Sequence, residues 1–157
     1  MASVWVRRYL LLLAVGENIP ILLTRIFLGC GFYLTGSGKI ANIDNLIKYF
    51  TELGVPFANL QAPFVARLEY YGAILLMLGL GTRLAAFLLS NTMLVALWLA
   101  EKDKFLSSWS PTSEVSPVEV VPFVYLLCLL WLVFRGGGYL SLDFGLWKLA
   151  LRKFPSR

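Results

Sequence analysis

Two ionisable residues stand inside long apolar stretches of the sequence. Arg25 lies within residues 19–36, and Glu69 lies within residues 63–80. An ionisable group in hydrocarbon is costly and normally faces the interior of a helix bundle. A carboxyl group there can donate or accept a proton, and a guanidinium can hydrogen-bond an anion or a carbonyl oxygen. Glu69 and Arg25 are therefore the candidate catalytic residues.

Small residues follow both charges at helical spacing. Gly29 and Gly36 share a helix face with Arg25, and Gly72 shares the face of Glu69. Faces of small residues allow helix backbones to approach closely, so we expect these helices to pack together there. Two interpretations remain open. The charges either neutralise each other in a structural ion pair or line a binding pocket.

Further donors could complete such a pocket. Lys39 and Arg83 lie near the two ends of the predicted helices, and Tyr33 and Tyr70 lie nearby. All four side chains can donate hydrogen bonds to a bound anion or carbonyl oxygen. For Arg83 the alternative is a simple anchor on the cytoplasmic side of a membrane. For Lys39, whose glycine-rich surroundings indicate the end of a helix, the alternative target is Glu69 or the lipid head groups.

Two other polar residues have expected structural roles. Asn91 lies in the middle of an apolar stretch and is expected to hydrogen-bond a neighbouring helix. Asp143 precedes a helical pattern and is expected to cap the N-terminus of that helix. A salt bridge from Asp143 to Arg83 or Arg135 is the alternative.

The composition excludes several kinds of redox and metal site. The sequence contains no His and two Cys, Cys30 and Cys128, which form no CxxC motif. Haem held by two imidazoles, the common zinc sites and His-based triads need residues that are missing, so no metal site is predicted. Both thiols are expected to be buried and inert, although a disulfide between the first and last helices remains open.

The elements that must position these residues are membrane helices. The chain has 157 residues, of which 59% are hydrophobic and 15% charged, and its mean hydropathy is +0.74. Since a spanning helix needs roughly 20 residues, there is room for about four spans in a single membrane domain over residues 1–157. We predict an all-α, integral membrane four-helix bundle with spans at residues 19–36, 63–80, 84–100 and 118–134.

Two amphipathic segments are predicted to lie on the membrane surface, at residues 43–53 and 144–154. Arg7 and Arg8 followed by residues 9–15 indicate an amphipathic lead-in rather than a cleaved signal peptide. The formal charge of +5 is attributed to membrane topology and not to nucleic-acid binding. Basic residues predominate on the side that holds both termini and Arg83, so both termini are expected in the cytoplasm, with a bacterial inner membrane as the location.

Several motifs resemble the DoxX family of small four-helix membrane proteins. They are RIFLGCGFYLTG at 25–36 followed by Lys39, LGVP at 53–56, ARLE at 66–69, LLMLGLGTRLAA at 75–86 and GGGYLSLD at 136–143. The family takes its name from subunits of an archaeal thiosulfate:quinone oxidoreductase, while other relatives are linked to oxidative-stress systems or have no assigned activity. The resemblance therefore implies the fold more strongly than the function.

Two functions are expected from the resemblance and the charged residues together. The first is a redox-linked subunit that handles quinone, with a partner chain that carries the redox centre. Hydrogen-bond donors such as Arg25 and Lys39 suit quinone carbonyls, and Glu69 suits proton transfer. The second is a non-enzymatic accessory or assembly subunit of a larger membrane protein complex. In both cases the expected partners are the lipid bilayer and other membrane subunits.

Overall fold

The computed structural model describes residues 16, 18–111 and 113–153, and the side chains of 151–153 are also outside the description. This part of the chain forms seven α-helices and a short 3-10 turn, with no strand. The predicted lead-in before residue 16 lies outside the described residues. The helices are α2 (Asn18–Ala41), α3 (Ile43–Glu52), α4 (Ala58–Leu78), α5 (Thr82–Leu99), α6 (Lys102–Ser107), α7 (Val121–Arg135) and α8 (Leu142–Lys153), with the 3-10 turn at Pro117–Glu119.

Four of these helices lie where membrane spans are predicted. Among the described residues, α2 and α5 are both long and apolar enough to cross a membrane. α7 is apolar but has 15 residues, and α4 has 21 residues but carries both Arg67 and Glu69. The all-helical class is thus confirmed, whereas the four-span bundle is supported at two of its helices.

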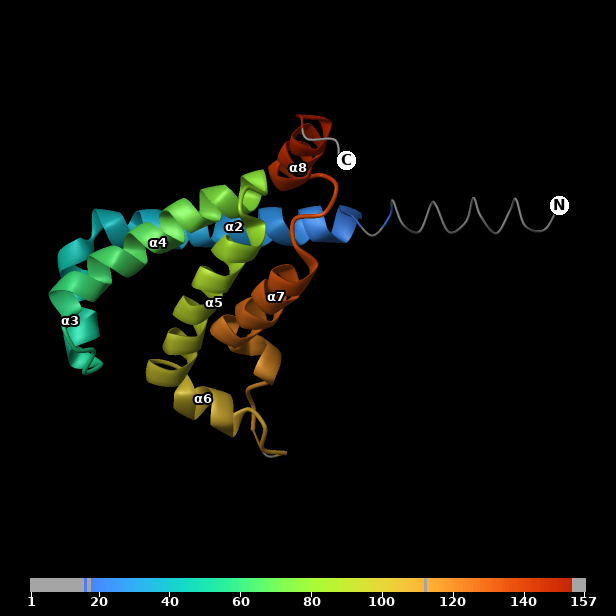
Figure 1. Cartoon of the computed structure of the whole chain (residues 1–157). Coiled ribbons are helices and arrows are strands. Elements are labelled where there is room, and N and C mark those ends of the chain that lie inside the picture. Colours follow the sequence, from blue (N-terminus) through green and yellow to red (C-terminus); the bar gives the residue numbers. More distant parts are fainter. Residues whose placement is uncertain (1–15, 17, 112, 154–157) are drawn as a thin grey trace.

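The long helices form two antiparallel pairs. α2 lies along α4, α5 lies along α7, and the second pair leaves the first at a steep angle (Figure 1). Contacts between α4 and α5 join the pairs, while α2 and α7 touch little. The main core lies where the pairs meet and includes Leu28, Phe32, Leu76, Leu89 and Leu132. The arrangement is therefore more open than a symmetric bundle.

The sequence predicts that the first long helix ends at the glycines, but the helix continues past them. α2 continues through Gly36 and Gly38 to Ala41. A Cβ at Gly36 would lie 2.7 Å from the backbone nitrogen of Tyr70, whereas a Cβ at Gly38 would meet nothing within 4 Å. Gly36 therefore permits close packing on α4 instead of ending the helix. The continuation also carries Lys39 onto the face that looks at α4.

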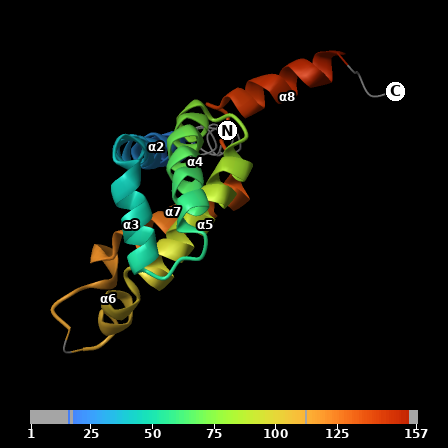
Figure 2. The ribbon, with the colours of Figure 1, turned by 90° about the vertical axis from the view of Figure 1, so that its left-hand side faces the viewer.

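The surface segments are present with shifted boundaries. α3 covers residues 43–52 and packs Leu46 against Ala62 and Ala66 of α4. α8 begins at Leu142, and its predicted end at residue 154 lies outside the described part. In Figure 2, α8 projects from the rest of the molecule. α6, which the sequence analysis did not predict, follows α5.

The turn between α4 and α5 is built around glycines. Gly79 has φ +70° and Gly81 has φ +58°, conformations that suit glycine. A Cβ on Gly79 would also collide with the guanidinium of Arg25. We call the end of the molecule that carries residues 79–82 and 136–141 the turn end.

Candidate functional site

A buried ion pair joins the two helices of the first pair. The Nζ atom of Lys39 lies 2.6 Å from both Oε1 and Oε2 of Glu69. The Glu69 side chain is 2% exposed, and that of Lys39 is 32% exposed. Lys39 also stands in the last turn of α2, where the helix dipole favours a positive charge. The Glu69 carboxylate is thus buried between the helices, while its partner Lys39 remains accessible to solvent or a ligand.

This ion pair forms part of the wall of a cavity of about 470 Å³. The remaining walls are mostly apolar and come from α3, α4, α5, the chain around residues 53–55 and the start of α7. The polar lining residues are Lys39, Gln61, Glu69, Asn91, Thr92 and Glu101. A ligand with a polar head and an apolar body would match this combination.

Asn91 does not bond a neighbouring helix, contrary to expectation. Its Nδ2 atom donates to the carbonyl oxygen of Phe87, one turn earlier in α5, at 2.7 Å. Asn91 also lines the cavity. The partner of Asn91 is therefore a backbone carbonyl of its own helix. The sequence pattern alone cannot distinguish such a bond from a bond to a neighbouring helix.

Arg25 and Glu69 do not form an ion pair. The Arg25 side chain is 1% exposed, and it donates to four carbonyl oxygens at the turn end. The contacts are Nε to Leu76 at 2.9 Å, Nη2 to Met77 at 2.8 Å, and Nη1 to Gly137 at 2.8 Å and Leu140 at 2.9 Å. The carbonyls of Leu76 and Met77 belong to the last turn of α4, where carbonyl oxygens lack the usual amide four residues on; that of Leu76 also accepts the amide of Gly79 at 3.2 Å.

The antiparallel register of α2 and α4 explains this separation. Arg25 is near the start of α2 and faces the end of α4, while Gly36 lies against Tyr70, beside Glu69. Lys39 then reaches back by one turn to the carboxylate. Gly29 likewise lies against α4, near Ala73, but Gly72 lies against Leu89 of α5. The predicted faces are present, yet they meet in a register that the sequence does not specify.

Asp143 caps a helix other than its own. Its Oδ1 accepts a hydrogen bond from the amide of Gly81 at 2.7 Å, and its Oδ2 accepts one from the amide of Thr82 at 2.9 Å. These amides belong to the start of α5. At the start of α8, the Oγ atom of Ser141 accepts from the amide of Phe144 at 3.2 Å. The prediction that Asp143 caps the C-terminal helix is therefore wrong.

The hydrogen bonds of Asp143 also determine its charge state. Burial alone would raise its pKa. The amides of Thr82 and Gly81, together with the positive charge of Arg25, outweigh burial and lower the pKa below its ordinary value. Arg25 thus binds the end of α4, and Asp143 binds the start of α5.

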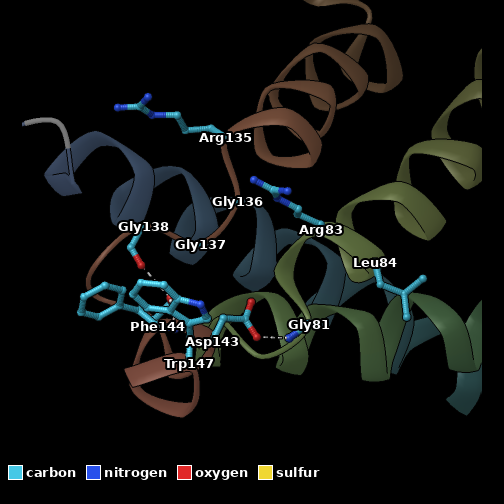
Figure 3. A pocket seen from close by; sticks show the side chains of 11 residues that line it. Gly81, Arg83, Leu84, Arg135, Gly136, Gly137, Gly138, Asp143, Phe144 and Trp147 are labelled. Atoms are coloured by element: carbon cyan, nitrogen blue, oxygen red, sulfur yellow. Dashed lines mark hydrogen bonds between the residues drawn. The ribbon is translucent and has the colours of Figure 1, made fainter. Parts of the chain in front are cut away.

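The remaining predicted ligand residues lie apart from the cavity. Arg83 lines a second pocket, at the turn end (Figure 3). The rings of Tyr33 and Tyr70 lie 5.0 Å apart, and neither residue lines the cavity beside Lys39. Of the six predicted catalytic and ligand-binding residues, Lys39 and Glu69 meet at the cavity, Tyr33 and Tyr70 meet outside its lining, and Arg25 and Arg83 lie at the turn end.

The cysteines offer no site. Cys30 and Cys128 are both free thiols, and Cys30 is exposed on α2, contrary to the expectation of burial. Within the described ranges, no group of three His, Cys, Asp or Glu residues could hold a metal ion.

The contribution of α3 was missed by the sequence analysis. Leu46, Tyr49 and Phe50 of α3 all line the cavity. The amphipathic pattern of residues 43–53 was the available signal, because its apolar face must cover something. The pattern predicts that this face lies on the membrane surface, whereas in the structure part of it covers the cavity.

Comparisons with known proteins agree with the motifs. A family model described as DoxX matches residues 21–102. A curated relative from Bacillus subtilis (strain 168), named "Putative oxidoreductase CatD", is 28% identical over 129 residues, which cover 80% of this chain and 86% of the relative. No solved structure matches.

Proposed function

The chain belongs to the DoxX family, and from that premise we propose that it is a redox-linked membrane subunit that binds quinone in the cavity beside Lys39 and Glu69. The observation that carries the proposal is the pairing of the buried Glu69 carboxylate with the partly exposed Lys39 ammonium in the wall of a mostly apolar cavity. The curated relative is named an oxidoreductase, which favours redox chemistry over other uses of such a cavity.

The shape and polarity of the cavity suit a quinone. Its volume of about 470 Å³ is within the range of roughly 300–1,000 Å³ that is typical of small-molecule sites. Phe50, Phe64 and Leu68 are among the apolar residues that would surround the ring and its tail. The ammonium of Lys39 has three N–H donors. Glu69 takes two of them, so a third is available for a quinone carbonyl.

The ion pair can also handle protons. Quinone chemistry exchanges two electrons and two protons with its surroundings, and an acid–base group within hydrogen-bond reach accelerates such transfers. When a quinone is reduced, the Lys39 ammonium would donate one proton, take up another from solvent through its exposed part and donate that as well. When a quinol is oxidised, the Glu69 carboxylate would accept one proton and the second would leave to solvent by way of Lys39. We assign the electrons to a redox centre on a partner chain, which the subunit would contact within the membrane.

In this proposal Arg25 positions the site and does not contact the ligand. Each of its three side-chain nitrogens already donates to a carbonyl oxygen. By holding the end of α4 it holds the helix that carries Glu69.

The test is to measure quinone bound to the protein purified in mild detergent. Quinone extracted per mole of protein should be close to stoichiometric for the wild type. It should fall about tenfold or more in Lys39→Gln, because a hydrogen bond from a charged donor contributes about 1.5–3 kcal/mol. Lys39→Gln alone leaves the Glu69 carboxylate buried and unpaired, which destabilises the fold. The Lys39→Gln/Glu69→Gln double variant leaves no such charge and should lose quinone to the same extent.

Lys48→Gln provides the matched control. Lys48 is an exposed lysine on α3 that does not line the cavity, so its removal should leave quinone content unchanged. If the wild type carries no quinone and takes none up from added ubiquinone or menaquinone, the proposal fails. The accessory or assembly role would then be the remaining function, and stoichiometric partner subunits should be retained after gentle solubilisation.

A further inference from the structure

The α5 wall of the cavity carries two polar side chains near the middle of the helix. Asn91 and Thr92 both line the cavity; Asn91 is exposed and Thr92 is half-buried. Because α5 is long and apolar enough to span a membrane, polar side chains in its middle are expected to face a polar partner or a cavity. The binding of quinone by Lys39 and Glu69 leaves these two residues without a role.

The hydrogen bonds within α5 determine which atoms the two side chains have left for a ligand. The Nδ2 atom of Asn91 donates to the carbonyl oxygen of Phe87 at 2.7 Å, and the Oγ1 atom of Thr92 donates to that of Leu89 at 2.8 Å. Since a carbonyl oxygen only accepts, the amide of Asn91 must present its nitrogen to Phe87 and turn its Oδ1 atom away. Among the described residues, none donates a hydrogen bond to this Oδ1 atom. Both side chains therefore retain acceptor oxygens.

The packing of α4 on α5 brings these acceptors near the ion pair. The two helices diverge from the glycine turn that joins them (Figure 1). A Cβ on Gly72 of α4 would lie 3.2 Å from the side chain of Leu89 on α5. Glu69 lies about one turn beyond this contact on α4, and Thr92 lies about one turn beyond it on α5. The polar groups of both walls thus lie near the end of the cavity where the helices are closest.

The part of the cavity further from the turn is apolar. Its facing residues are Phe64 and Val65 on α4 and Val95 and Leu99 on α5, and Phe50 of α3 also lines it. A ligand with a polar head and an apolar tail would therefore place its head between Glu69 and Asn91. Its tail would extend between the diverging helices.

Acceptors outnumber donors at the head position. The Glu69 carboxylate has about four lone-pair sites, of which Lys39 occupies two. Asn91 and Thr92 add acceptor oxygens, whereas the available donors are one N–H of Lys39 and one of the Asn91 amide. A quinone offers carbonyl acceptors alone, while each hydroxyl of a quinol both donates and accepts. Because an acceptor that a ligand covers without pairing is penalised, this balance favours the quinol.

We propose that Asn91, assisted by Thr92, accepts a hydrogen bond from a quinol hydroxyl and makes the cavity selective for the reduced form of its ligand. This inference rests on the proposed quinone site and specifies the redox form that the site prefers. Tighter binding of quinol than of quinone raises the reduction potential of the bound couple, by about 30 mV for a tenfold difference in affinity. The cavity would then favour the transfer of two electrons from the partner chain, with two protons, to a bound quinone.

Calorimetric titration of the full chain in mild detergent tests the proposal. The probes are decylubiquinone and, in anaerobic buffer, decylubiquinol. The wild type should bind decylubiquinol about tenfold more tightly than decylubiquinone. Asn91→Leu should weaken decylubiquinol binding about fivefold to tenfold and change decylubiquinone binding less than about twofold, because a neutral hydrogen bond is lost only with the reduced form. Thr92→Val should act in the same direction, by about threefold.

Ser90→Ala is the matched control. The Oγ atom of Ser90 donates to the same Phe87 carbonyl, also at 2.7 Å, but Ser90 is buried and does not line the cavity. Its removal should change both affinities less than about twofold. The control separates the loss of an acceptor in the cavity from the loss of a local hydrogen bond in α5. Thermal unfolding of each variant in the same detergent checks that a change in affinity does not reflect a change in fold.

The outcomes distinguish this inference from the quinone site on which it rests. If Asn91→Leu weakens both probes equally or neither of them, the assigned selectivity is wrong and quinone binding stands. Equal affinity of the wild type for the two probes leads to the same conclusion. If the wild type binds neither probe, the proposed function fails and the selectivity fails with it.

Discussion

At the scale of single residues, most of the buried charge in the described chain has a specific partner. Lys39 neutralises Glu69, while Arg25 satisfies carbonyls at the end of α4 and Asp143 satisfies amides at the start of α5. Buried polar groups are tolerated when they are hydrogen-bonded and costly when they are not. The pair of Lys39 and Glu69 lines the cavity and can take part in chemistry there, whereas Arg25 and Asp143 hold helix ends.

The ion pair should behave asymmetrically on mutation. Lys39→Gln leaves the buried Glu69 carboxylate without its cation, so we expect it to destabilise the protein by about 3 kcal/mol. The Lys39→Gln/Glu69→Gln double variant should recover most of that loss, because no charge then remains buried and unpaired. Thermal unfolding in detergent measures both. Equal destabilisation in the single and double variants would mean that Lys39 does not neutralise Glu69.

Asp143 should give stability a dependence on acid pH. Its pKa is lower in the folded protein than in the unfolded chain, so its contribution is present above the unfolded value of about 3.9 and is lost as the pH falls through the folded value. Asp143→Ala should therefore cost about 1 kcal/mol at pH 7, the usual effect of losing an N-cap. The difference between wild type and variant should shrink below about pH 4.

Unfolding midpoints at pH 7 and at acid pH measure this difference. Asp103→Ala is the control, because Asp103 is exposed in the first turn of the six-residue α6, at the end of the molecule away from the turn end (Figure 1). A penalty for Asp143→Ala that is the same at both pH values would contradict the assigned role of the carboxylate charge.

At the scale of elements, the packing of α2 on α4 depends on Gly36 and not on Gly38, two residues further along. A Cβ at Gly36 would press on the backbone of Tyr70, whereas one at Gly38 would enter open space. Alanine is favoured over glycine in a helix interior by about 1 kcal/mol. Gly38→Ala should therefore stabilise α2 by up to that amount, and Gly36→Ala should destabilise the protein by forcing the helices apart.

The two glycine variants differ in a second measurable way. Separation of α2 and α4 would also lengthen the contact between Lys39 and Glu69, so Gly36→Ala should lose bound quinone, whereas Gly38→Ala should keep it. If both variants gain stability equally, the close approach at Gly36 does not limit the packing.

The helices also show which parts of the structure are predictable from sequence. Apolar length and glycine or proline boundaries located all four long helices, and the pattern of residues 43–53 located α3. The extent of α2 was mispredicted because a helix interior tolerates glycine where another backbone packs closely against it. The pairing of Arg25 was mispredicted because a face shared by two helices does not specify their register along the axis.

A cap whose partner is distant in the sequence cannot be predicted from local sequence patterns either. Asp143 lies next to the start of α8, so local signals assign it to that helix, yet its partners Gly81 and Thr82 are 62 and 61 residues away in the chain. Tertiary structure brings the loop after α7 onto the α4–α5 turn. The cavity was predicted in part, because Glu69 and Lys39 were selected from the sequence while its apolar walls from α3 and α5 were not.

At the scale of the whole molecule, the distribution of charge predicts an orientation in the membrane. The turn end carries Arg83, Arg135 and Lys148, with Asp143 engaged by backbone amides. At the opposite end, acidic residues lie among the lysines of α3 and α6. Because basic residues favour the cytoplasmic side, we expect the turn end to face the cytoplasm and the cavity to open toward the outer half of the bilayer.

Cysteine labelling tests this orientation. In a background of Cys30→Ala and Cys128→Ala, single variants Ser107→Cys on α6 and Gly145→Cys on α8 place thiols at exposed positions of opposite ends. A membrane-impermeant maleimide added to intact spheroplasts should label Ser107→Cys, and it should label Gly145→Cys only after the membrane is permeabilised. The reverse pattern would place the turn end outside the cell. In that orientation the positive charge of the turn end would require an explanation other than membrane topology.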